Sequence, residues 1–131
     1  MENRNDLLIK IRGNALGIIS ENSSLDEKFQ NETLRPILKL NSDLWIASFK
    51  NYIGKHKLDF YKLSVEKKLL FIETSIQRDI KYRNVLKGMV LAWFTTTEFD
   101  YYCENASNLN KRITNLIIER LKSQVQLFNL V

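Results

Sequence analysis

The sequence has few of the residues that break helices or cross-link a chain. Its 131 residues include four Gly, one Pro, one Cys and one His. Scarce Gly and Pro favour long helices over short strands joined by tight turns. The single Cys103 excludes an internal disulfide, and we expect its thiol to be buried, because free cysteine behaves as a small apolar residue.

Long apolar runs are also missing. No segment approaches the roughly 18 consecutive apolar residues that are typical of a membrane-spanning helix. Charged residues near the N-terminus interrupt the apolar run that a secretion signal needs. We therefore expect a cytoplasmic protein that does not enter a membrane.

The chain lacks the usual equipment of enzymes and metalloproteins. It has no glycine-rich phosphate loop, no nucleophile elbow and no Cys or His spacing that suits zinc. The only histidine, His56, lies in a Lys-rich turn, where we interpret it as an exposed group at a helix C-terminus. We predict no catalytic residue, no cofactor and no metal. The alternative is a small enzyme of unknown reaction with a polar pocket around Arg35.

What the chain does contain is helical periodicity. Apolar residues recur at three- and four-residue spacing over residues 6–19, 26–53, 65–94 and 95–128, with no alternating strand pattern. We predict an all-α fold, a single-domain helical bundle of five or six helices over residues 1–131. Residues 1–24 would be a loosely packed N-terminal helix and link, and residues 65–94 and 95–128 the long central pair.

Capping residues mark the expected starts of these helices. Ser24 and Ser64 each precede a periodic apolar run, and Ser, Thr, Asp and Asn are preferred where a helix begins. Thr95 and Glu98 have the spacing of a capping box, in which each side chain bonds a backbone N–H of the other.

Three positions leave alternatives open. Either Thr33 caps a helix that carries Pro36 in its first turn, or a longer helix kinks at Pro36. Asp79 either caps a new helix or lies inside a continuing one. We interpret residues 95–131 as one long helix, and the alternative is a break near Ala106 with Ser107 as a new cap.

The last helix departs from simple amphipathicity. Its polar face carries Lys111 and Asn115, yet Ile118 projects onto that face near Lys122. One interpretation is a single surface isoleucine. The other is that Ile118 and Lys122 belong to an association face, which a protein partner or a second copy of the chain covers.

A polar stripe lies within residues 31–43. Asn31 and Arg35 are four residues apart and share a helix face, with Asp43 a further turn or two away. This pattern is typical of a solvated face with local ion pairs. Alternatively, the three residues form a polar contact site or a buried network between helices.

The positive charge is concentrated in the middle of the chain. The net charge is +5, and residues 50–87 hold ten basic and four acidic side chains, a net of +6. The candidate basic patch comprises Lys67, Lys68, Arg78, Lys81, Arg83 and Lys87, with Tyr82 as an aromatic member. Such a patch suits RNA or a ribosome, although it equally describes a solvated lysine-rich surface.

Three segments carry a resemblance to other proteins: NETLRPILK at residues 31–39, IQRDIKYRN at 76–84, and LNKR with ERLKSQ within 109–124. They resemble a group of short uncharacterised all-α proteins of the Bacteroidota, over nearly the whole chain. The resemblance implies a bacterial, cytoplasmic protein. Some of those proteins carry a glyoxalase label, but glyoxalases are built from βαβββ modules around a metal held by His and Glu residues. With one histidine and no strand pattern, this chain is not expected to be a glyoxalase-type lyase.

The function we predict from the sequence is a non-catalytic helical interaction module that binds a protein partner or self-associates. The association face and the polar stripe favour it. The alternative is an RNA- or ribosome-binding protein that uses the basic patch.

Overall fold

The computed structural model describes residues 2–17, 22–56 and 59–128, and these residues form helices joined by short irregular segments, with no strand. They contain eight α-helices, with a π-helical segment (Gln30–Leu34) between the second and third and 3-10 turns at Phe60–Lys62 and Val125–Leu127. They are α1 (Arg4–Arg12), α2 (Leu25–Phe29), α3 (Arg35–Leu40), α4 (Ser42–Gly54), α5 (Val65–Arg78), α6 (Ile80–Leu91), α7 (Thr96–Glu104) and α8 (Ala106–Ser123). The all-α single-domain prediction is confirmed, and five or six helices was a slight undercount.

The helices begin where the sequence places capping side chains. Ser24 and Ser64 accept hydrogen bonds from backbone N–H groups in the first turns of α2 and α5. Thr95 and Glu98 form the complete capping box at the start of α7. Asp79 caps α6, so residues 65–94 form two helices instead of one. Each cap satisfies an N–H group that has no partner inside its own helix.

Two predicted helices end earlier than expected. The helix predicted over residues 95–131 breaks at Asn105, whose side-chain amide donates to the carbonyl oxygen of Tyr101 at 2.9 Å. Asn readily forms such local bonds in place of helical ones, and Ser107 does not cap α8. The first helix ends before Gly13, whose φ of +80° favours glycine. Residues 18 and 19 of that predicted helix lie outside the described residues.

Residues 25–40 form one continuous helical path in spite of Pro36. Proline has no N–H, so it cannot bond the carbonyl four residues earlier. The preceding turn is widened, and the N–H of Arg35 donates to the carbonyl of Gln30, five residues back. Thr33 is not a cap, because its hydroxyl donates to Oε2 of Glu98 at 2.7 Å. The wide turn therefore joins α2 to α3 and also meets α7.

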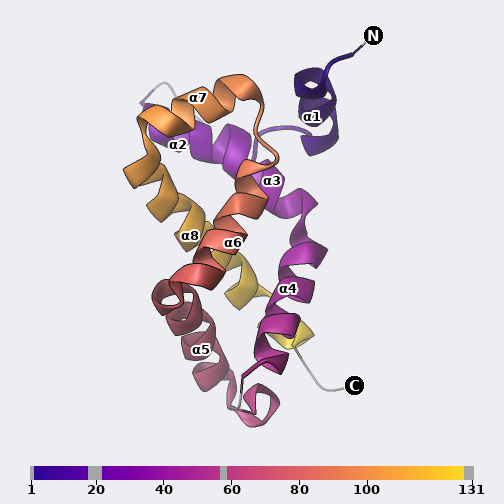
Figure 1. Ribbon diagram of the computed structural model, residues 1–131, viewed down its shortest axis with the longest axis vertical. Helices are drawn as coiled ribbons and strands as arrows, with labels where there is room; N and C mark the ends of the chain where they lie inside the picture. Colours follow the sequence, from indigo (N-terminus) through magenta and orange to yellow (C-terminus); the bar gives the residue numbers. More distant parts are fainter. Residues whose placement is uncertain (1, 18–21, 57–58, 129–131) are drawn as a thin grey trace.

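The centre of the fold is α8. It packs against α3, α4, α5, α6 and α7, and it runs through the middle of the molecule from the end beside α7 toward the lower end of α4 (Figure 1). Its buried side chains are Leu109, Ile113, Leu116, Ile117, Ile118 and Leu121. Because burial of a large apolar side chain contributes roughly 1.5–3 kcal/mol, these six side chains make α8 a major contributor to the stability of the fold.

Polar side chains hold α1 beside the turn between α6 and α7 (Figure 1). Arg4 donates to the carbonyl oxygens of Ala92 and Phe94 at 2.7 and 2.8 Å. Arg12 donates to both carboxylate oxygens of Glu98 at 2.5 and 2.7 Å. Several apolar side chains of α1 stay exposed, namely Leu7, Ile9 and Ile11. The N-terminal helix is thus attached by specific hydrogen bonds more than by apolar packing.

Candidate functional site

The six residues of the predicted basic patch do not form one surface. Lys67 and Arg78 lie at opposite ends of α5, about 16 Å apart at 1.5 Å per residue. Lys68 is only 8% exposed, and its Nζ lies 5.7 Å from the centre of the Phe60 ring. The expectation that Lys68 is a surface cation was therefore wrong, because its apolar stem packs at the edge of the core. Lys81 is exposed at the start of α6.

Tyr82, the expected aromatic member of the patch, also faces inward. Its ring stacks on Tyr52 with centroids 4.1 Å apart, and its hydroxyl lies 3.1 Å from that of Ser48. Burial raises the pKa of Tyr82 to about 12. Its ring is part of an internal aromatic stack and does not offer a surface on which a base could stack.

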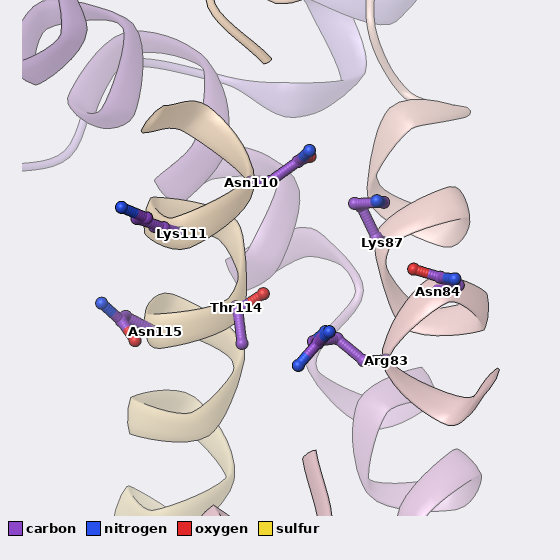
Figure 2. A pocket seen from close by; sticks show the side chains of 7 residues that line it. All are labelled: Arg83, Asn84, Lys87, Asn110, Lys111, Thr114 and Asn115. Carbon is purple, nitrogen blue, oxygen red and sulfur yellow. The ribbon is translucent and has the colours of Figure 1, made fainter. Parts of the chain in front are cut away.

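Arg83 and Lys87 lie in a groove between α6 and α8 (Figure 2). The groove has a volume of about 510 Å³ and is lined by Arg83, Asn84, Lys87, Asn110, Lys111, Thr114 and Asn115. Three of these side chains are cations, the other four are amides or a hydroxyl, and none of the seven is acidic. A groove lined by charge of one sign concentrates ligands of the opposite sign.

The cations of the groove have no acidic partner among the described residues. The ion pairs within those residues involve Lys10, Arg12, Lys62 and Lys122. Arg83, Lys87 and Lys111 are in none of them. Their positive charge is therefore available to an anionic ligand.

Two hydrogen bonds from outside the groove hold its side chains in place. Arg83 donates through Nη1 to the carbonyl oxygen of Gln77, near the end of α5, at 2.6 Å. The Tyr102 hydroxyl, from α7, donates to Oδ1 of Asn110 at 2.6 Å. Because the amide oxygen of Asn110 is engaged, its NH₂ group is left for the groove. Figure 2 shows Asn110 extending from α8 toward α6, near the level of Lys87.

Half of this groove was missed by sequence reasoning. The predicted patch contains Arg83 and Lys87 from α6, and Lys111 was recognised only as part of the polar face of the last helix. Asn110 and Thr114 were not singled out. The spacing of Lys111 and Thr114 places them near one another on α8, but nothing local to the sequence shows that α6 packs beside them.

The candidate polar contact site is only partly assembled. Nε of Arg35 donates to Oδ1 of Asn31 at 2.9 Å, and the backbone carbonyl of Asn31 accepts from the N–H of Leu16 at 2.8 Å. Asp43 is exposed in the first turn of α4 and lines a separate hollow with Lys50. The Asn31 backbone therefore joins the linker after α1 to the π-helical turn, Arg35 bonds the Asn31 side chain along the same helical path, and Asp43 is not part of either contact.

The expected association face is internal. Ile118 is 5% exposed and belongs to the core cluster, so its assignment to a surface was wrong. Ile118 faces inward because five helices pack against α8 and leave only the side that carries Lys111 and Asn115 exposed. Lys122 pairs with Glu73 of α5, with Nζ and Oε1 3.4 Å apart. Both residues make contacts within the chain.

A second polar cluster lies where α1 meets α7. Arg12 donates to Glu98 and to the Trp93 carbonyl oxygen, at 3.1 Å in the latter contact. Burial alone would raise the pKa of Glu98, but hydrogen bonds from Arg12, from the Thr95 N–H and from the Thr33 hydroxyl outweigh it. The pKa of Glu98 is therefore held below its usual range. Every charge here has a partner inside the protein.

The remaining candidates give no catalytic arrangement in the described part of the chain. His56 is exposed, and its Nδ1 lies 2.8 Å from the Tyr52 carbonyl oxygen at the end of α4. Cys103 is exposed on α7, which corrects the expectation of a buried thiol. No group of three or more His, Cys, Asp or Glu residues there is placed to hold a metal. No described helix has the length and apolar character needed to span a membrane.

Comparisons of the chain with known protein families, with curated proteins and with solved structures give no match. Function is therefore inferred from the groove itself.

Proposed function

We propose that the protein is a non-catalytic interaction module that binds RNA through the groove between α6 and α8. The observation that carries this proposal is the set of three cations, Arg83, Lys87 and Lys111, in one groove without an acidic partner among the described residues. Lys and Arg contacts to phosphate supply most of the sequence-independent affinity for nucleic acids.

The other lining groups suit the same ligand. Asn84, Thr114 and Asn115 carry amide or hydroxyl groups that both donate and accept hydrogen bonds. The 2′-hydroxyl of RNA does the same, and proteins use it to recognise an RNA backbone. Arg78 and Lys81, exposed where α5 meets α6, extend the positive charge beyond the groove.

RNA is favoured over a protein partner or a second copy. The apolar association face that favoured those partners centred on Ile118, and that side chain is buried. The groove instead offers polar and positively charged groups. Its seven lining side chains are three cations, three amides and one hydroxyl, a set that matches the phosphate and hydroxyl groups of an RNA backbone.

We further propose that binding takes place in a bacterial cytoplasm. The resemblance to Bacteroidota proteins supports this setting, in which ribosomal RNA is an abundant partner of the required chemistry.

Salt dependence of RNA binding tests the proposal. Fluorescence anisotropy with a labelled RNA hairpin should give affinity that falls between about 50 and 200 mM salt, with a log–log slope of about −2 to −3 for three phosphate contacts. A flat curve, or no binding at low salt, contradicts the proposal. Recovery of a protein partner that resists nuclease, with no RNA bound, would support the protein-binding alternative instead.

A further inference from the structure

The arrangement around Asn110 points to a more specific feature of the groove. We infer that Lys87 and Asn110 form a prearranged subsite for one backbone phosphate, with Arg83 as the cation for the next phosphate along the groove, and that Tyr102 is a positioning residue for the subsite. This inference rests on the proposed function and names the chemical group that the groove holds.

Tyr102 fixes the orientation of the Asn110 side chain. The Tyr102 ring is buried between Phe94 and Phe99, with centroid distances of 5.9 and 6.1 Å. Its hydroxyl therefore has a defined position, from which it donates to Oδ1 of Asn110 at 2.6 Å. Because the oxygen accepts from Tyr102, the NH₂ group is the part of the amide that is left for the groove, and Figure 2 shows the Asn110 side chain extending from α8 toward α6.

The two cations on the α6 side of the groove come from successive turns of the helix, and Lys87 is the one that lies near Asn110 (Figure 2). Arg83 and Lys87 are four residues apart and thus lie on the same face of the helix. The bond from Arg83 to the carbonyl of Gln77 uses Nη1, and it restrains the guanidinium while leaving other N–H groups for a ligand. A restrained side chain loses less conformational entropy when it binds.

The hydrogen-bonding character of these groups selects the ligand. The ammonium of Lys87 and the NH₂ of Asn110 are both donors, as is the neighbouring guanidinium of Arg83. A phosphate diester offers acceptor oxygens and a negative charge, whereas the edge of a base mixes donors with acceptors. The subsite therefore suits the backbone of RNA more than its bases.

Replacement of Tyr102 by Phe tests the inference directly. Tyr102→Phe removes the hydroxyl that orients Asn110 but keeps the buried ring. Loss of one oriented hydrogen bond, worth about 1 kcal/mol, should weaken binding of the RNA hairpin about fivefold. The salt slope should stay unchanged because no cation is lost, whereas Lys87→Ala should reduce its magnitude by about 0.7–0.9.

A double substitution separates positioning from a general structural effect. If Tyr102 acts through Asn110, Tyr102→Phe combined with Asn110→Ala should bind no more weakly than Asn110→Ala alone. Tyr101→Phe is the matched control, because it removes the neighbouring hydroxyl of α7, which donates to Asp26 and not to the groove. Its RNA affinity should equal that of the unmodified protein.

Asn110→Asp gives a second variant if Tyr102→Phe does not fold. It keeps an oxygen that accepts from Tyr102 but replaces the NH₂ donor by a negative charge, so binding should weaken more than tenfold. Unchanged affinity in Tyr102→Phe or Asn110→Asp, with Lys87→Ala still weakened, overturns the subsite and leaves the proposed function standing. Absence of RNA binding by the unmodified protein removes both.

Discussion

Two clusters of cationic side chains in this molecule have opposite surroundings. Arg12 has a side chain that is 6% exposed and forms two hydrogen bonds with Glu98, whose side chain is 16% exposed. Arg83, Lys87 and Lys111 line an open groove and have no acidic partner among the described residues. The first cluster attaches α1 to the fold, and the second presents charge to solvent.

The difference separates charge that stabilises the fold from charge that can bind. A buried ion pair is satisfied within the protein, so breaking it leaves an uncompensated charge and destabilises the folded state. Cations that have no acidic partner among the described residues form no ion pair that stabilises the fold, and their charge remains available to a ligand. Substitutions in the Arg12–Glu98 cluster should therefore change stability, whereas substitutions in the groove should change binding.

The largest stability effect is expected from Arg12→Ala. It leaves the Glu98 carboxylate largely buried without its charged partner, which should lower the free energy of unfolding by about 3 kcal/mol. Urea denaturation followed by circular dichroism measures this change. Lys10→Ala is the control, because Lys10 pairs with Glu2 on the surface and its removal should cost less than about 0.5 kcal/mol. Equal effects of the two substitutions would show that the α1 contact is not a buried one.

Lys68→Ala should have an intermediate effect on stability and none on RNA binding. The side chain packs against Phe60, so its removal should lower the free energy of unfolding by about 1–2 kcal/mol. Thermal unfolding and hairpin binding on the same sample measure both quantities. Weakened RNA binding without loss of stability would show that Lys68 contacts RNA and does not serve mainly to stabilise the fold.

Acid should weaken the contact between α1 and α7. The folded-state pKa of Glu98 lies below its usual value, so ionised Glu98 stabilises the folded state at neutral pH. That contribution is lost as the pH falls from the ordinary glutamate value of about 4.3 through the lower folded pKa. The stability difference between the unmodified protein and Glu98→Gln should therefore shrink as the pH is lowered through this range. A difference that stays constant in urea denaturation at each pH contradicts the role given to the carboxylate.

Modification of Cys103 should have the smallest effect. The thiol is exposed on α7, so alkylation with a maleimide should proceed in the folded protein and leave the melting temperature and the RNA affinity unchanged. Mass spectrometry measures the alkylation, thermal unfolding measures the melting temperature, and a hairpin titration measures the RNA affinity. A thiol that reacts only after denaturation would place Cys103 in the interior after all.

The features that were predictable from the sequence are those set by neighbouring residues. The capping box of Thr95 and Glu98 and the caps at Ser24 and Ser64 need only three-residue spacing, whereas the sequence left open whether Asp79 starts a new helix. The all-α fold follows from apolar periodicity. Prediction of these features succeeds because local hydrogen bonds and helical spacing determine them.

The features that were not predictable depend on which helices meet. Ile118 is buried because α8 has neighbours on several sides, while a helical projection assumes one core-facing side. Lys68 and Tyr82 were assigned to the surface by residue type, yet both pack against rings of other segments. Only the α6 side of the groove was predictable, because Arg83 and Lys87 are close in sequence, whereas Asn110 comes from a separate helix.

The central claim is that RNA binding depends on the position of the groove cations and not on overall charge. The groove variant carries Lys87→Glu and Lys111→Glu together. The control variant carries Lys62→Glu and Lys67→Glu, which reverse two exposed lysines outside the groove. Each reversal changes the charge by two units, so the net charge falls from +5 to +1 in both proteins. In a hairpin titration at fixed salt, the groove variant should bind at least about tenfold more weakly than the control. Equal affinities would contradict the claim and reduce the groove to one part of a diffuse positive surface.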